Sequence, residues 1–182
     1  MLTRPTLSQW ILVAAALFAC TAGPAAEAVP ESRLKAAIVS KFPQFVEWPD
    51  AAVEGRQTIN ICVAAPDPFA SDLQEMVSGE QLNGRTLALR RVDTPAQVTD
   101  CHVLFLPAGS GTNRPLLAAA TRLPVLTVSD DPGFLDVGGI VALRVIDGRV
   151  RFEVNAEFAR RVGLRISSQL LRLALSVRGG TQ

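Results

Sequence analysis

Side chains suited to acid–base catalysis are scarce in this chain. Its 182 residues include one histidine, His102, and no tyrosine. A Ser-His-Asp triad would need His102 as its base, but His102 lies at the start of an apolar run and the sequence has no G-x-S-x-G nucleophile elbow. We therefore predict that the protein is not an enzyme, has no catalytic residue and uses no cofactor.

A glycine-rich loop is a candidate for binding a small molecule. Gly109, Ser110, Gly111 and Arg114 lie between an apolar run and a predicted helix, which is the setting of a nucleotide-binding loop. Arg114 stands where the third glycine of G-x-G-x-x-G would be. Backbone N–H groups, the helix N-terminus and Arg114 could still hold an anion. An ordinary flexible connection is the alternative interpretation.

Residues 1–28 are predicted to be a signal peptide. A short basic stretch precedes an apolar run at 10–19 that is too short to span a membrane. Ala26-Glu27-Ala28 fits the small-x-small pattern that signal peptidase prefers, so the mature chain should begin near Val29. The alternative is a lipoprotein box ending at Cys20. Both interpretations predict that the mature domain leaves the cytoplasm.

Cys62 and Cys101 are the cysteines of the predicted mature chain. An even pair in an oxidising compartment suggests a disulfide, which would close a loop of about 40 residues and stabilise the fold by about 4 kcal/mol. Two free buried thiols are the alternative. No metal site is predicted, because these cysteines lack C-x-x-C spacing and Asp130-Asp131 begins an Asp-Asp-Pro-Gly sequence typical of a turn.

Alternating strands and helices should position these residues. Apolar, β-branched runs predict strands at 58–65, 86–92, 101–106 and 125–129. Helical patterns occupy 31–48, 68–79 and 114–122, and Pro43 should kink the first of these or end its regular part. This order predicts one α/β domain over 29–182, a three-layer Rossmann-like fold with a mostly parallel sheet flanked by helices. Right-handed crossovers would place strands 58–65 and 101–106 side by side.

The C-terminal part predicts a β-hairpin followed by helix. Runs 140–146 and 150–154 are joined by an Asp-Gly turn and should add an antiparallel edge to the sheet. Beyond Gly163, apolar residues recur with a period near 3.6 as far as Val177, which predicts a mostly buried helix.

Composition and one aromatic cluster bear on the partners. The chain is 48% hydrophobic with a net charge of +1, and it has no basic patch that would suggest nucleic acid. Phe42, Phe45 and Trp48 could pack on the core or could anchor another protein at the surface.

Several dispersed sequence blocks carry a family resemblance. They are LKAA at 34–37, FVEWP at 45–49, NGR at 83–85, GRVRFEVN at 148–155 and GLRISSQLLRLA at 163–174. With these blocks, residues 34–177 resemble the YfiR-like family of exported bacterial proteins.

The resemblance implies a periplasmic α/β domain that is often dimeric. The best-known family member is a repressor that binds the periplasmic region of an inner-membrane GGDEF diguanylate cyclase. Its release, influenced by an OmpA-like outer-membrane lipoprotein and by redox state, raises cyclic di-GMP and promotes biofilm formation. We expect the same partners and a homodimer here. The alternative is a periplasmic small-ligand sensor or transport accessory protein that uses the loop 109–113.

The resemblance also bears on the cysteines. Cys62 and Cys101 correspond to a disulfide of that repressor. A second disulfide of the repressor, near the terminal hairpin, has no counterpart because no cysteine remains in this chain.

Overall fold

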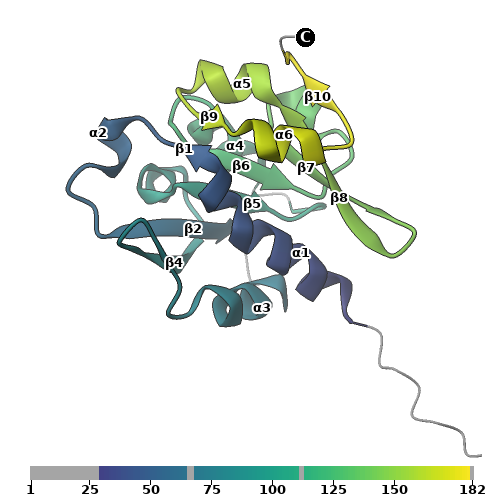
Figure 1. Ribbon diagram of the computed structural model, residues 1–182, viewed down its shortest axis with the longest axis horizontal. Coiled ribbons are helices and arrows are strands. Elements are labelled where there is room, and N and C mark those ends of the chain that lie inside the picture. Colours follow the sequence, from purple (N-terminus) through teal and green to yellow (C-terminus); the bar gives the residue numbers. More distant parts are fainter. Residues whose placement is uncertain (1–28, 65–67, 111–112, 181–182) are drawn as a thin grey trace, which may run out of the picture.

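The computed structural model describes residues 29–64, 68–110 and 113–180. The predicted signal peptide and Gly111 lie outside these residues. In the described part the strands form one sheet in the order β10-β8-β7-β6-β5-β2-β4-β3, with the small sheet β1-β9 beside it (Figure 1).

The strands follow the apolar runs of the sequence. Their bounds are β1 (Val46–Glu47), β2 (Thr58–Ala64), β3 (Gln81–Leu82), β4 (Arg85–Val92), β5 (Val103–Leu106), β6 (Leu126–Ser129), β7 (Val141–Ile146), β8 (Arg149–Asn155), β9 (Arg165–Ile166) and β10 (Val177–Arg178). β4, β2, β5, β6 and β7 run parallel to one another, and β7 and β8 form an antiparallel hairpin. The prediction of a mostly parallel sheet flanked by helices is therefore confirmed, and β2 lies beside β5 as expected.

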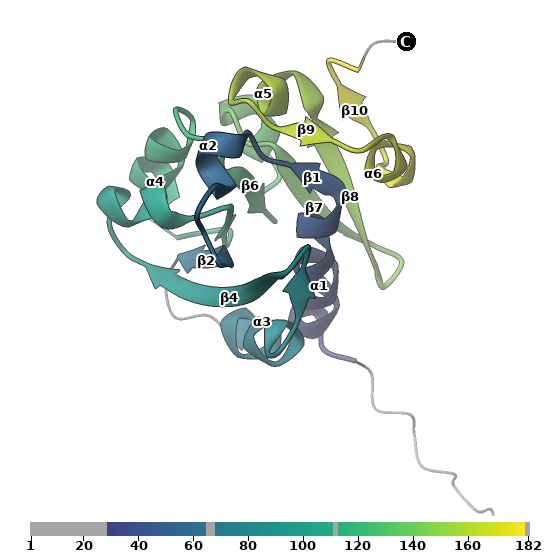
Figure 2. The same cartoon turned by 60° about the vertical axis from the view of Figure 1, so that its left-hand side comes forward.

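Helices cover both faces of this sheet (Figures 1 and 2). The α-helices are α1 (Glu31–Lys41), α2 (Asp50–Val53), α3 (Pro68–Val77), α4 (Asn113–Ala120), α5 (Ala156–Arg161) and α6 (Ser168–Leu173), and the 3₁₀ helices are η2 (Phe42–Phe45), η3 (Pro95–Asp100) and η4 (Phe134–Val137). Alternate side chains of a strand point to opposite faces, so each face has its own core. One core contains residues of α1, α3 and α5, and the other contains residues of η3, α4 and η4.

The first helix ends where its proline predicts. α1 stops at Lys41, and Pro43 lies in the 3₁₀ helix η2 because its ring cannot continue an α-helix. The chain then enters β1, whose Val46 pairs with Ile166 in β9. The α-helix therefore ends at Lys41, before the aromatic residues, whereas the sequence pattern predicted helix as far as residue 48.

The prediction of a long buried C-terminal helix is wrong. Between residues 164 and 177 only α6 is helical. It begins after Ser167, whose side chain accepts a hydrogen bond from the Leu170 N–H. Leu170 is 2% exposed, whereas Leu173 is 59% and Leu175 is 49% exposed. The Leu175 N–H donates to the carbonyl of Phe152, so strand pairing ends the helix despite its favourable periodicity. Tertiary hydrogen bonds have overridden the local pattern.

The described helices are all too short or too polar to cross a membrane.

Candidate functional site

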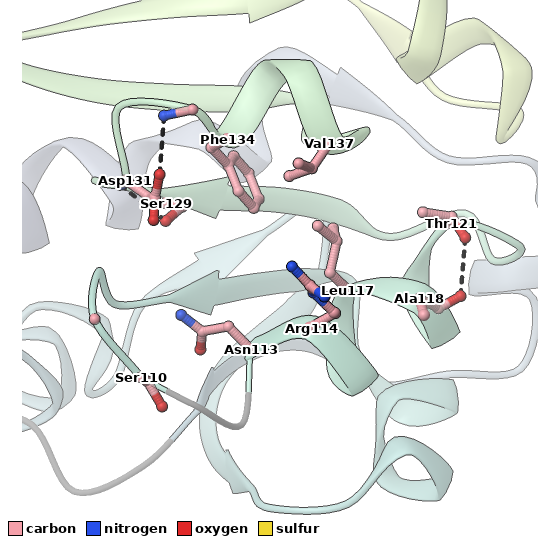
Figure 3. Close-up of a pocket in the computed structure, with 12 residues that line it drawn as sticks. Ser110, Asn113, Arg114, Leu117, Ala118, Thr121, Ser129, Asp131, Phe134 and Val137 are labelled. Atoms are coloured by element: carbon pink, nitrogen blue, oxygen red, sulfur yellow. Dashed lines mark hydrogen bonds between the residues drawn. The ribbon is translucent and has the colours of Figure 1, made fainter.

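A cavity of about 570 Å³ opens beyond the carboxyl ends of β5 and β6. Ligands of open α/β sheets usually bind at this edge, because the loops that follow parallel strands converge there. One wall comes from α4 and the other from the segment that runs from the end of β6 through η4 (Figure 3). Its size lies within the usual range of small-molecule sites.

The α4 wall carries the polar groups. Asn113 begins α4, and its side-chain N–H donates to the carbonyl of Pro107, which holds the loop after β5 against the helix. Its Oδ1 is buried and has no hydrogen-bond partner in the described structure. Arg114, which is exposed, forms no ion pair within the described residues and points toward the opposite wall (Figure 3).

The opposite wall contributes two large apolar side chains. Phe134 and Val137 of η4 face Leu117 of α4 across the cavity (Figure 3). A Cβ atom at Gly139 would overlap the Phe134 ring, so the second glycine of Gly138-Gly139 is needed for this packing. Gly138 has a φ of 95°, a left-handed conformation that favours glycine.

Asp131 belongs to a turn at the rim of the cavity. Its Oδ1 accepts a hydrogen bond from the Gly133 N–H at 2.8 Å, and the N–H of Asp131 donates to Ser129 Oγ at 3.1 Å. The Asp-Asp-Pro-Gly sequence is therefore a turn, as its composition indicates. No cluster of three or more metal-ligating side chains occurs in the described part of the chain.

An ion pair holds α1 to the same edge of the sheet. Lys35 Nζ lies 2.6 Å from Asp130 Oδ2 and 2.5 Å from Glu31 Oε1, and the side chains of Lys35 and Asp130 are only 14% and 21% exposed. Burial acts to raise the pKa of Asp130, but hydrogen bonds from Lys35 and from the Ala108 N–H lower it overall. Burial likewise acts to lower the pKa of Lys35, and its two carboxylate partners outweigh that effect and raise it.

The predicted loop contributes part of this cavity. Gly109, Ser110 and Arg114 line it, while Gly111 lies outside the described residues. The sequence did not single out Asn113 or Phe134 as site residues. Asn113 lies in the glycine-rich loop 109–113 and is the first residue of α4. Anion binding by the loop stays a prediction.

The aromatic cluster lies mostly against the core. Phe42 is 1% exposed and its ring packs edge-on against Phe152, with centroids 5.5 Å apart. Phe45 and Trp48 are partly buried and pack on the same core. Partner binding by these three residues stays a prediction, and Phe42 offers almost no surface for it.

His102 and the disulfide lie at the other end of the sheet. His102 is 2% exposed; its Nδ1 accepts from the Asn60 N–H at 3.0 Å, and its Nε2 lies 3.3 Å from the carbonyl oxygen of Ala52. Burial lowers the pKa of His102, the hydrogen bond to Ala52 opposes this, and the charges of Arg56 and Arg85 lower it further. With both ring nitrogens engaged, His102 has a structural role here.

The structure joins Cys62 and Cys101 in a disulfide. Their Cα atoms are 5.8 Å apart, and the two residues are 0% and 5% exposed. The bond ties β2 to the residue that follows η3, two positions before β5 begins.

Exposed apolar side chains gather in the last part of the chain. Val145 and Ile146 are 42% and 45% exposed at the end of the β7–β8 hairpin, and Leu173 and Leu175 are exposed beside β8. Figure 1 shows the hairpin turn extending away from the body of the domain.

The fold is an α/β domain whose mostly parallel sheet is flanked by helices, with a cavity at the carboxyl end of its strands. The chain belongs to the YfiR/HmsC-like family, whose model matches residues 32–175. This is a family of periplasmic regulatory proteins, so the membership assigns the chain to a regulatory class of protein.

Two solved structures are similar to this chain. A conserved domain protein from Vibrio cholerae O1 biovar El Tor aligns with a TM-score of 0.53 and 12% identity over 82% of this chain and 61% of that chain. The ABC domain in complex with L-Trp from Streptococcus pneumonia aligns with a TM-score of 0.49 and 12% identity over 70% of this chain and 58% of that one. The chain thus spans less than two thirds of either protein, and the likeness to the Vibrio protein concerns the fold alone.

Proposed function

We propose that this protein is a periplasmic repressor of an inner-membrane GGDEF diguanylate cyclase. The family match over residues 32–175 is the observation that carries the proposal. In this mechanism the protein binds the periplasmic region of the cyclase in its inactive state and so shifts the equilibrium toward that state. Cyclic di-GMP and biofilm formation then rise when the protein is released, for example by an OmpA-like lipoprotein.

The exposed leucines beside β8 are the surface that we assign to the cyclase. Leu173 and Leu175 would bury apolar area on binding, and each fully buried leucine contributes about 2 kcal/mol. The charged residues around them, Arg172 and Arg178, would lie at the rim of such an interface. A homodimer could present two of these surfaces to a dimeric cyclase.

Deletion of the gene tests the repressor function directly. We expect cyclic di-GMP to rise on deletion and to fall again on complementation. A Leu173→Ser/Leu175→Ser variant should fail to complement, while Val29→Ser, which removes an aliphatic group that is 55% exposed and lies outside the cavity, should complement fully. An unchanged cyclic di-GMP level after deletion, in a strain that carries the cyclase, would contradict the proposal.

A small-ligand sensor is the second candidate function. The observation that favours it is the buried Oδ1 of Asn113, which has no partner among the described residues and lies beside a cavity of about 570 Å³. A buried polar atom without a partner costs about 1–3 kcal/mol, which a ligand N–H or O–H group would recover. Thermal unfolding in the presence of a metabolite panel tests this function, and a saturable rise in melting temperature that Asn113→Ala abolishes would support it.

A further inference from the structure

The outer edge of β4 is open along most of its length. β2 pairs with β4 from Thr86 to Val92 on one side, but β3 covers only Arg85 and Thr86 on the other. Figure 2 shows β4 along the border of the sheet with α3 beside it. Five residues, 88–92, therefore have no strand on their outer side within the described structure.

The directions of the backbone groups follow from two hydrogen bonds. The Thr86 N–H donates inward to the carbonyl of Gln57, and the Leu87 N–H donates outward to the carbonyl of Glu80. Because successive residues of a strand alternate between its two sides, Leu89 and Arg91 direct their N–H and C=O groups outward like Leu87. No element of the described chain accepts or donates at these positions.

A groove lies directly above these free backbone groups. It has a volume of about 350 Å³ and lies between β4 and α3, where its lining residues are Ala70, Ser71, Gln74, Leu89 and Arg91. A strand added to β4 would place alternate side chains into this groove. Arg91 is exposed and forms no ion pair among the described residues, whereas Arg90 on the other face lies 3.5 Å from Asp100.

We propose that the β4 edge and the α3 groove bind an extended acidic segment of another protein by strand addition. The free N–H and C=O groups of Leu89 and Arg91 would pair with the main chain of that segment. Its side chains would contact Leu89 in the groove, and one carboxylate would pair with Arg91. This inference does not depend on repression of a cyclase.

A second copy of this chain is a poorer occupant of the same edge. Two open stretches 88–92 that pair antiparallel about a two-fold axis would centre on Arg90 or Arg91, because the Leu87 N–H already donates to Glu80 and a pairing centred on Leu89 would need it. Two arginines would then lie directly opposite each other, and like charges in that position are destabilising. Charged residues on an edge commonly prevent self-association, and here they leave an acidic strand as the complementary partner.

Binding of a designed peptide tests the proposal. The probe is a fluorescein-labelled peptide of alternating valine and glutamate, seven residues long, and its control has lysine for each glutamate. We expect saturable binding of the glutamate peptide by fluorescence anisotropy. The lysine peptide should bind at least about tenfold more weakly. Hydrogen exchange of the Leu89 and Arg91 amides should slow when the glutamate peptide is bound. No binding of the glutamate peptide at millimolar concentration would overturn the proposal, as would equal binding of the two peptides.

Substitutions along the β4 edge provide a second test of the proposal. Leu89→Pro removes an outward N–H that has no native partner, so it should abolish binding while the domain stays folded. Arg91→Ala should weaken binding about five- to tenfold, and Arg90→Ala, the matched arginine on the other face, should change it less than twofold. If Leu89→Pro unfolds the protein, Arg91→Glu decides instead, because it should reverse the preference between the peptides. A wild-type dimer that Leu89→Pro or Arg91→Glu converts to monomer would assign the edge to a second copy and overturn the proposal.

Discussion

The two ends of the parallel strands use their polar groups differently. At the amino end His102 engages both ring nitrogens and a buried disulfide lies close by. Trp48 Nε1 is buried there without a partner among the described residues. At the carboxyl end Asn113 Oδ1 is buried beside an open cavity, and Arg114 is unpaired in the described structure. The difference indicates that the amino end secures the fold and the carboxyl end remains available for binding.

Removing the disulfide should have the largest effect on stability, and it tests whether the amino end secures the fold. Replacing Cys62 and Cys101 by alanine should lower the free energy of unfolding by about 4 kcal/mol, because the unfolded chain loses a cross-link. Urea unfolding with and without a reducing agent measures the loss. The wild type should respond to the reductant and the double variant should not. A wild type that is insensitive to complete reduction would show that the bond adds little.

A methyl group at Gly139 should damage the carboxyl end by nearly as much. Gly139→Ala drives a Cβ atom into the ring of Phe134, and overpacking of this kind costs about 3 kcal/mol. Gly133→Ala is the control, because its Cβ would lie 3.6 Å from Asp131 Oδ1, an ordinary contact distance. Comparable thermal stability of the two variants would mean that Phe134 has another position available.

Breaking the ion pair of α1 should have an intermediate effect. Lys35→Met leaves Asp130 without its cation and should cost about 2 kcal/mol. Arg33→Met is the matched control on the same helix; Arg33 is 48% exposed and 3.2 Å from Glu75, so its loss should cost about 0.5 kcal/mol. Equal losses in chemical denaturation would show that the buried pair is no stronger than the surface one.

Mild acid should weaken the amino end before the carboxyl end. The pKa of His102 is lowered from its ordinary value of 6.5, so the unfolded chain takes up a proton at a higher pH than the folded chain. The free energy of unfolding should therefore fall as the pH drops below 6.5, by at most about 1.4 kcal/mol per pH unit. Asp130, whose pKa is lowered from 3.8, adds its own loss only near and below that pH.

His102→Asn isolates this effect, because the asparagine side chain can still accept from the Asn60 N–H but does not titrate. Urea midpoints of the variant should be flat between about pH 5 and pH 7, where histidine alone normally titrates. An unchanged slope in the variant would assign the acid sensitivity to another group.

Arg114→Ala should have the smallest effect on stability. Its exposed side chain has no ion pair in the described chain, so the free energy of unfolding should change by no more than about 0.5 kcal/mol. Any ligand-induced rise in melting temperature should shrink in this variant, while Arg122→Ala, near the other end of α4, should respond like the wild type. A large loss of stability would place Arg114 in the framework of the fold.

Local patterns predicted those parts of the molecule that local chemistry determines. The Asp-Gly turn between β7 and β8 has the positive φ values that a primed turn needs. Pro43 ends α1 because its ring fixes the backbone and removes the N–H donor that the helix would need. The alternation of strands and helices likewise sufficed for the fold class.

The candidate site depended on contacts that no local pattern contains. Phe134 meets Leu117 across a cavity whose walls are distant in the sequence, and Gly139 matters through a ring five residues earlier. The C-terminal helix was mispredicted because Leu175 bonds to Phe152 on another element. The burial of Phe42 depends on its contact with Phe152 in β8, which is 110 positions away in the sequence.

The contacts of α1 and β1 also constrain the order in which the chain can fold. Lys35 reaches a partner 95 positions later, and Val46 pairs with Ile166. As the chain emerges from its N-terminus, the cysteines at 62 and 101 are both free to join before either contact can form. The contacts of Lys35 and Val46 with these later residues therefore form after the disulfide can close, and an early cross-link in the middle of the chain limits the conformations available until then.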